Sequence, residues 1–493
     1  MADCLHGAYG QVNDTGARSS DESLSAIVYF GTAPVNQLQL ATGESYPVNK
    51  PILVNNIAEA KKRFGYSDDW AAYTLCEAMN VHFQRKGVGP LILINVLDPT
   101  THKKSTQSSI SRTPANGMIT IPEAENVIID TIAIANKTKG TDYAVTYNVD
   151  KKLIIITELT AGGLGTDALT VTYYETDPAT VTDANVIGTT DGAGTNTGLY
   201  SVKNVYQMTG YIPAFLAAPG FSSHPAVHDA MKAVSQKINS HWDAYMFVDM
   251  PLTYNSTPVT IATAATVKAA AGYTAPNETV YFPVAEGTDG RIYHLSVLAA
   301  ANFQELLMDQ DGIPYRSASN TACDMIANLY VNADSTGKIY DDSLINNHLN
   351  QNGIASAAYV GGRWVIWGAH SADYDQENAD YVNVAETNRM MLYYISNDFQ
   401  ERRNRDVDQP LTPNDLSTLV GEEQARLDAL VGSGALIYGE VTVDATADAR
   451  SDVLSGDFSF TFNVTTTPLA KSLTAHVNWT DAGFVTYFVS TEE

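Results

Sequence analysis

Hydrophobic and polar positions recur with two different periods along this chain. Short, almost continuous apolar runs are typical of strands buried on both faces of a sheet, and they occur at residues 25–30, 91–97, 214–218 and 244–250. Between these runs, apolar residues recur every three to four positions, which predicts helices. The positions sharing one helical face are Ala72, Cys76, Met79 and Phe83, and then Val227, Met231, Val234 and Ile238. Alternating strands and helices predict a mostly parallel sheet with right-handed crossovers.

The first predicted helix, at residues 70–84, follows Asp68 and Asp69, which can cap it. In the last third of the chain, residues 388–398 have helical character, and Thr412 to Asp415 resemble a capping box with proline at the first helical position. The helix that begins there carries an apolar stripe made of Leu416, Leu419, Val420, Leu427, Leu430 and Val431. Further strands are expected at residues 435–443, 458–464, 473–479 and 484–489.

Residues 98–200 lack the helical period. Thr, Gly, Asp and Asn dominate this region, and its alternating segments predict a small all-β domain of the sandwich type. The expected strands are residues 127–135, 143–149, 153–157 and 169–174. Because strand–helix alternation lies on both sides, we interpret this region as an insertion into the α/β domain.

Together, these patterns predict an α/β core with a parallel sheet, an inserted all-β sandwich domain, an α+β C-terminal domain, and an extended arm at each end. The polar residues 1–23 cannot bury a face of their own, so they form either an arm paired with something else or a frayed terminus. The expected boundaries are 1–23 for the N-terminal arm, 24–97 with 201–380 for the α/β domain, 98–200 for the sandwich, 381–472 for the C-terminal domain and 473–493 for a C-terminal strand.

The charge of the chain excludes some functions. A net charge of −26 argues against nucleic acid and anionic membranes as partners, because both require basic residues. Only 17% of residues are charged, which is expected if much surface lies against other protein, or if Ser, Thr and Asn supply a β-rich surface. No apolar run approaches the ~18 residues that span a bilayer, and the first residues lack the pattern of a signal peptide. The scattered Cys4, Cys76 and Cys323 predict no disulfide framework.

Candidate catalytic or metal-binding residues are few. His224 and His228 have the spacing of a helical metal pair, but no HExxH glutamate accompanies them, so surface histidines are the better interpretation. Asp309 to Gly312 resembles the start of a calcium loop, yet the twelfth position is Asn320. No glycine-rich run continues into Gly-Lys-Ser/Thr, and no serine lies in a G-x-S-x-G turn. We therefore predict no cofactor, no metal and no enzyme activity, with a serine hydrolase as a weak alternative.

Residues 349–370 form the most specific segment of the chain. They read Leu-Asn-Gln-Asn-Gly-Ile-Ala-Ser-Ala-Ala-Tyr-Val-Gly-Gly-Arg-Trp-Val-Ile-Trp-Gly-Ala-His, which predicts a helix end, a strand, a hairpin turn and a second strand. This order resembles the Leu-Asn-x-x-Gly-Ile … Trp-Gly segment of the contractile-tail sheath proteins of phages and R-type tailocins. Weaker matches follow in chain order: His6-Gly7-Ala8-Tyr9, Gly31-Thr32-Ala33, Pro51 to Val54 with Phe64-Gly65, and Ser317 to Asn320.

The resemblance implies a structural subunit that polymerises helically, in stacked hexameric rings, around an inner tube and contracts by rigid-body rearrangement. The α/β part would be a subtilisin-like domain without proteolytic activity, the sandwich would lie on the outer surface, and the C-terminal domain would face the tube. The implied partners are further copies of the chain, the inner tail tube protein, and the baseplate and tail terminator proteins. The implied location is the tail sheath of a virion or tailocin particle, assembled in the cytoplasm of a bacterial host.

The resemblance also implies that neighbouring subunits exchange their chain ends as added strands. The exchanged N-terminal residues would be His6, Gly7, Ala8, Tyr9, Gln11 and Val12, and those of the C-terminal strand Leu473, Ala475, Val477 and Trp479. The acceptor sheet would comprise Ile437, Val441, Val443, Phe458, Phe460 and Phe462. Glu422, Glu423 and Asp428 lie on the polar side of the late helix, either as a solvated face or as a charged contact with a partner in the assembly. The candidates for contact with the tube are Glu422, Glu423 and Arg426. The alternative function is a surface or secreted structural protein with a β-sandwich adhesin module, which would need a signal peptide and an anchor.

Overall fold

The computed structural model describes residues 25–41, 43–329, 340–377, 380–443 and 453–487. The chain divides into two units, Met1–Leu419 and Val420–Glu493.

The first unit is built on an eight-stranded sheet with the order β19-β18-β14-β11-β10-β1-β3-β2. Its strands are β1 (Ser25–Gly31), β2 (Ile52–Val54), β3 (Leu91–Asn95), β10 (Ile212–Ala217), β11 (Tyr245–Asp249), β14 (Glu278–Tyr281), β18 (Ile354–Val360) and β19 (Arg363–Trp367). The strands from β3 to β18 run parallel, whereas β2 and β19 are antiparallel at the two edges. The predicted α/β core with a mostly parallel sheet is thereby confirmed, and the two antiparallel edge strands make the sheet mixed.

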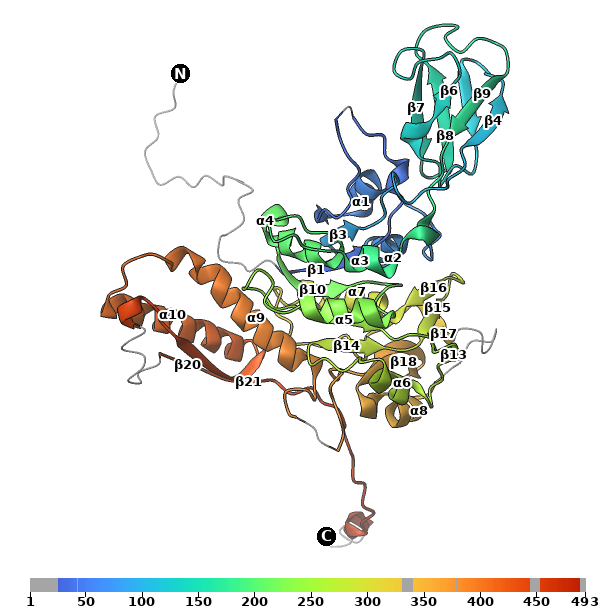
Figure 1. Cartoon of the computed structure of the whole chain (residues 1–493). Helices are drawn as coiled ribbons and strands as arrows, with labels where there is room; N and C mark the ends of the chain where they lie inside the picture. Colours follow the sequence, from blue (N-terminus) through green and yellow to red (C-terminus); the bar gives the residue numbers. More distant parts are fainter. Residues whose placement is uncertain (1–24, 42, 330–339, 378–379, 444–452, 488–493) are drawn as a thin grey trace, which may run out of the picture. The chain divides into compact units, whose positions relative to one another are not determined.

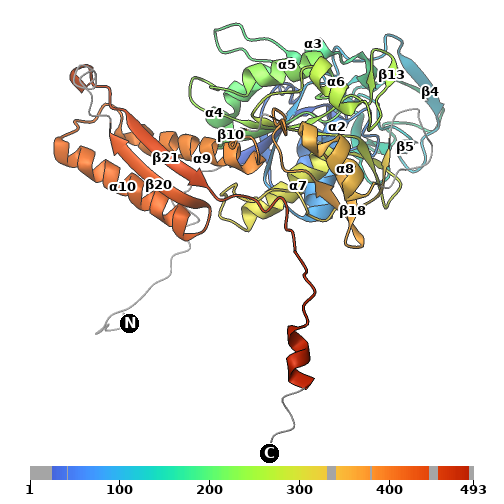
Figure 2. The same ribbon diagram turned by 90° about the horizontal axis from the view of Figure 1, so that it is seen from below.

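Helices cover both faces of this sheet, and this is why its inner strands are continuous apolar runs. Figure 2 shows α3 (Asp183–Ile187), α5 (Pro225–Val234) and α6 (Ala264–Ala270) along one side and α7 (Leu295–Met308) along the other. On the α7 side, the ring of Phe303 packs 4.9 Å from that of Phe215 in β10 and 5.5 Å from that of Phe247 in β11. The remaining helices of this unit are α1 (Ile57–Phe64), α2 (Thr74–Met79), α4 (Val205–Thr209), α8 (Asp342–His348) and α9 (Glu386–Arg403).

The helix predicted at residues 70–84 is shorter and less regular than expected. It begins at Thr74 as α2, and a π-helical turn, Asn80–Lys86, continues it. The backbone N–H of Thr74 donates to the hydroxyl of Thr32 at 3.1 Å, and the N–H of Thr32 lies 3.3 Å from the hydroxyl of Thr74. This contact with the end of β1 holds the preceding residues in a turn, so Asp68 and Asp69 do not cap the helix.

Residues 108–173 form two three-stranded antiparallel sheets, β4-β9-β6 and β5-β8-β7. The strands are β4 (Ser108–Arg112), β5 (Met118–Ile121), β6 (Ala133–Ile134), β7 (Tyr143–Asn148), β8 (Leu153–Glu158) and β9 (Leu169–Tyr173). They enclose a core of their own that includes Ile119, Val145, Ile154, Ile156 and Val171. The sequence pattern missed β4 and β5. In β4 the reason is that the strand carries three serines and a single apolar residue, Ile110. It also overestimated residues 127–135, where a 3-10 turn, Ile129–Thr131, precedes the two-residue β6.

Small sheets complete the first unit. β15 (Val284–Gly287) pairs with both β16 (Ile292–His294) and β17 (Met325–Leu329), and β12 (Thr253–Tyr254) pairs with β13 (Thr257–Pro258).

Helix α10 (Pro413–Gly432) begins at the predicted capping box. The backbone N–H of Asp415 lies 3.3 Å from the Thr412 hydroxyl, and the backbone N–H of Thr412 donates to the Asp415 carboxylate at 2.9 Å. Both of these donors would otherwise lack a partner at the helix start. The predicted start of this helix is therefore confirmed.

In the second unit, β20 (Leu436–Val443) and β21 (Phe460–Thr466) form an antiparallel pair along the C-terminal half of α10 (Figure 2). Leu427 and Leu430 of the helix and Val441 of β20 are buried. The strand approaches the helix so closely that a Cβ at Gly439 would lie 2.9 Å from the Cβ of Leu427. The Gln424 side chain donates to the carbonyl of Gly439 and accepts from the N–H of Val441, both at 3.0 Å, which ties β20 to α10.

The C-terminal segment departs from one prediction. The strand expected at residues 484–489 is instead a 3-10 helix, Ala482–Tyr487. Residues 467–480 are extended and, within the described ranges, pair with no other strand. The predicted N-terminal arm, residues 1–23, lies outside the described residues.

Candidate functional site

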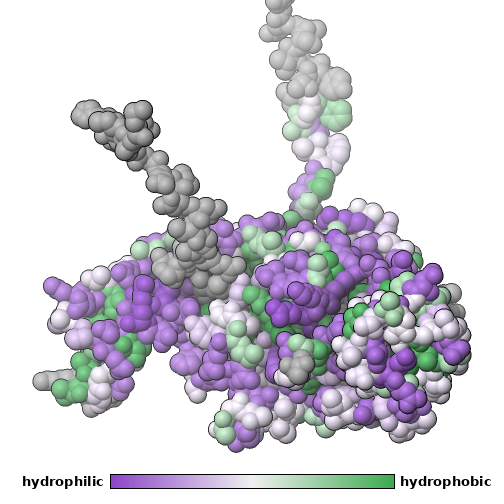
Figure 3. Space-filling view, turned by 90° about the horizontal axis from the view of Figure 1, so that it is seen from above, coloured by the Kyte–Doolittle hydropathy of each residue, from purple (hydrophilic) through white to green (hydrophobic). Residues whose placement is uncertain are grey.

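The C-terminal extension exposes large apolar side chains. Leu473, Val477 and Trp479 are 90%, 91% and 82% exposed. With Ala475 they occupy alternate positions, so an extended backbone directs all four to one side. Figure 3 shows hydrophobic residues along this extension. A row of exposed apolar side chains on an unpaired extended segment indicates an interaction surface.

The apolar side of the β20–β21 pair faces α10, where Val441 is buried and Gly439 approaches Leu427. Val441 lies opposite Phe462 and Val443 opposite Phe460, so these four predicted acceptor residues share one face of the pair. The other two predicted acceptor residues do not join them. Ile437 is 57% exposed at a register irregularity of β20, and Phe458 precedes the first residue of β21.

The three residues proposed to contact the tube do not form a single exposed group. Glu422 is exposed and Arg426 is half-buried, whereas Glu423 is only 1% exposed. Glu423 precedes the buried Leu427 by four residues and Leu430 by seven, so it lies on the same helical face as they do. We therefore correct the assignment of Glu423 to the polar side of the helix.

Packing explains why the segment at residues 349–370 carries these particular residues. Gly353 has φ = +65°, and a Cβ there would lie 2.7 Å from the carbonyl oxygen of Ser371. The indole N–H of Trp367 donates to the side-chain oxygen of Asn346 at 3.0 Å, and the backbone N–H of Gly368 donates to the hydroxyl of Ser319 at 3.1 Å. These contacts join the end of α8, the β18–β19 hairpin and the Ser317 to Asn320 loop, so several of the matching motifs form one structural junction.

Comparisons with known proteins give a consistent result. No protein-family model matches the chain. The chain is 26% identical to the tail sheath protein of Burkholderia phage BcepMu over 96% of each chain. It is 22% identical to the major tail sheath protein of Serratia phage KSP20, over 62% of this chain and 73% of that protein. Over nearly its whole length the chain is therefore similar to contractile-tail sheath proteins.

Solved structures show that the fold is shared at low sequence identity. The helical sheath of the anti-feeding prophage in the contracted state matches with a TM-score of 0.54 and 12% identity, over 97% of this chain and 99% of that one. The sheath complex of an extracellular contractile injection system, PVC, matches with a TM-score of 0.53 and 11% identity, over 97% and 100%. A sheath tail protein from Desulfitobacterium hafniense gives 0.51 and 12% over 93% and 100%.

A buried polar cluster in this chain contains the residue types of a hydrolase in a different arrangement. The Ser296 hydroxyl donates to the Asp249 carboxylate at 2.5 Å, and the Nδ1 of His294 lies 2.6 Å from the carboxylate of Glu77. Among the described residues, no serine is hydrogen-bonded to a histidine. Burial by itself lowers the pKa of His294, but the nearby carboxylates of Glu77 and Asp249 outweigh it and raise the pKa to about 9. The charged imidazole therefore fastens α2 to the start of α7 as a structural clamp.

The two histidines considered as a metal pair have different environments. His224 is on the helix edge, 47% exposed, with its Nδ1 2.6 Å from the carboxylate of Asp183. His228 is fully buried, with its Nε2 2.6 Å from the carboxylate of Glu278 and its ring stacked on Tyr273 at 4.0 Å. The expectation of surface histidines is wrong for His228, because Pro225 starts α5 so that its fourth residue faces the sheet. No group of three or more metal-binding side chains occurs in the described ranges.

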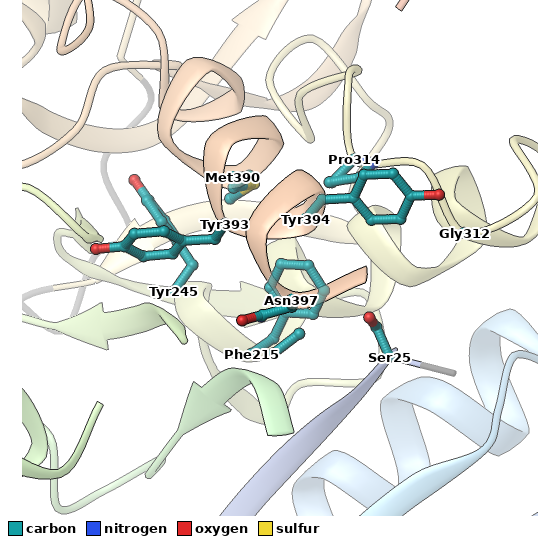
Figure 4. A pocket seen from close by; sticks show the side chains of 10 residues that line it. Ser25, Phe215, Tyr245, Gly312, Pro314, Met390, Tyr393, Tyr394 and Asn397 are labelled. Carbon is teal, nitrogen blue, oxygen red and sulfur yellow. The ribbon is translucent and has the colours of Figure 1, made fainter. Parts of the chain in front are cut away.

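A small pocket lies between α9 and the strands β10 and β11 (Figure 4). Met390, Tyr393, Tyr394 and Asn397 line it from α9, and Phe215 and Tyr245 line it from the sheet. The Asn397 amide donates to the carbonyl of Asp243 at 2.8 Å and accepts from its backbone N–H at 3.1 Å. Aromatic rings and one engaged amide attach α9 to the sheet here, and they form no catalytic set. Within the described part of the chain, no helix is long and apolar enough to cross a membrane.

Proposed function

We propose that this protein polymerises into a helical tube around an inner tail tube and that the tube contracts by rigid-body movement of its subunits. Its partners would be further copies of the chain, the tube protein, and the baseplate and terminator proteins. It would act in the tail of a virion or tailocin particle after assembly in a bacterial cytoplasm. The proposal draws on the sheath relatives and on the contracted helical sheath of the anti-feeding prophage, which shares the fold.

The observation that carries the proposal is the exposed apolar side of the C-terminal extension. Full burial of Leu473, Val477 and Trp479 in a neighbouring subunit would contribute about 1.5–3 kcal/mol for each side chain. Strand addition would also satisfy the extended backbone, at roughly 1 kcal/mol net for each hydrogen bond. Within the described residues β20 and β21 form a sheet of two strands, which supports this pair as the acceptor of an added strand.

The fully buried sheet of the first unit supports rigid-body movement. Every residue of β3, β10, β11 and β14 is buried, so the core would resist internal rearrangement during contraction. The chain carries no phosphate-loop motif, so the driving free energy would come from interfaces that are better buried in the shortened state. The proposal also includes a subtilisin-like topology for the first unit, an outer position for the inserted sheets and a C-terminal domain that faces the tube.

Substitutions on alternate positions of the extension test the exchange. The triple variant L473S/V477S/W479S should remain a folded monomer and fail to form tubes, because these side chains are exposed in the single chain. The matched control T474S/H476S/N478S changes the intervening positions and should still assemble. Sedimentation and negative-stain microscopy distinguish the two. Normal tubes from the first variant would refute the exchange of the C-terminal strand.

A further inference from the structure

Two of the few cations of this acidic chain lie together on α1 and pair with no acidic residue in the part of the chain that the structure describes. The chain has 29 basic and 55 acidic residues. Lys62 and Arg63 are exposed in the last turn of α1, and within the described ranges neither forms an ion pair. The adjacent Lys61, in contrast, lies 3.5 Å from the carboxylate of Asp150. We call Lys62 and Arg63 the basic edge.

The opposite end of the sheet is acidic. Helix α1 packs on the edge strand β2, whereas α8 packs on β18 near the other edge, and Figure 1 shows the two helices at opposite ends of the sheet. Residues 340–385 contain six acidic residues and a single basic one, Arg363. Asp342 in the first turn of α8 and Glu377 in the loop between β19 and α9 are exposed, and in the described part of the chain neither forms an ion pair. We call Asp342 and Glu377 the acidic edge.

We propose that the basic edge of one copy contacts the acidic edge of the next copy within the assembly. Opposite charges at opposite ends of one subunit produce a head-to-tail contact, which closes into rings or continues as a helix. A second copy is the partner indicated because each copy supplies both edges, while the net charge of −26 would separate copies in other orientations. The inference rests on the proposed self-assembly and adds a lateral contact that is separate from strand exchange.

Charge reversal tests this contact. K62E/R63E makes both edges acidic, and D342K/E377K makes both edges basic. At about 50 mM salt, each variant alone should raise the critical concentration for tube formation about tenfold, the effect expected for roughly two surface ion pairs per contact. An equimolar mixture of the two variants should assemble like the wild type, because each unlike pair of edges is then complementary. At about 500 mM salt, the differences should vanish through screening.

The control R112E/K151E reverses two exposed cations of the inserted sheets and changes the net charge by the same amount. Basic residues in the last turn of α1 also stabilise the helix itself, so the thermal unfolding of each variant is measured. If K62E/R63E fails to fold, the neutral variant K62Q/R63Q takes its place. Tubes that form equally well from K62E/R63E and from the control would overturn this contact, as would a mixture that fails to recover. Absence of tubes from the wild-type protein would overturn the proposed self-assembly as well.

Discussion

The buried pair of His228 and Glu278 yields the sharpest stability prediction for this protein. Both side chains are fully buried, and their closest nitrogen and oxygen atoms are 2.6 Å apart. The substitution His228→Phe keeps the ring that stacks on Tyr273 but removes the only side-chain partner that Glu278 has in the described contacts. The remaining hydrogen bond to the Glu278 carboxylate comes from the backbone N–H of Ala275 at 3.0 Å. Breaking one side of a buried pair typically costs about 3–5 kcal/mol, so we expect a loss of that size in the free energy of unfolding.

Urea unfolding followed by circular dichroism measures this loss. The control His224→Phe makes the same change four residues earlier, at a 47% exposed histidine with a surface carboxylate partner, and should cost less than about 1 kcal/mol. The double variant H228F/E278M removes both polar partners, and its stability should recover to within about 2 kcal/mol of the wild type. Equal, small losses for His228→Phe and His224→Phe would refute the reasoning, as would a double variant as unstable as the sum of its single changes.

Three further predictions follow from the sequence and the structure. Deletion of residues 1–20 should leave a soluble monomer that forms no tubes in electron micrographs, and tubes from the truncated protein would disprove N-terminal exchange. Because the folded-state pKa of His294 is about 9 and its unfolded value is about 6.5, its stabilisation is complete below pH 6.5 and is lost as the pH rises through 9. Thermal unfolding should therefore weaken across that alkaline range, and His294→Gln should flatten the slope. Gly353→Ala should lower the free energy of unfolding by more than about 2 kcal/mol, because the added Cβ would clash with the carbonyl oxygen of Ser371. Gly361 also has a positive φ but faces open space, so Gly361→Ala should cost about 1 kcal/mol. Equal losses for the two variants would contradict this steric argument.

The difference between His224 and His228 shows where inference from the sequence ends. Their spacing placed both on one helix, but neither the pattern nor the composition indicated that Glu278 would face His228 across 50 residues of chain. Glu423 was misassigned for a similar reason. Its charge suggested the polar side of α10, whereas its position four residues before Leu427 places it on the buried face.

The sequence by itself determined the α/β core, most of its buried strands, the start of α10 and the likeness to contractile-tail sheath proteins. These features depend on local periodicity, capping chemistry and a motif whose residues are close together in the chain. Only the tertiary structure decided the position of the mixed-sheet edges, the turn that delays α2, the strands β4 and β5, and the buried partners of His228 and His294. Each of these depends on contacts between residues far apart in the chain, whose free energy outweighs the local preference that a sequence pattern records.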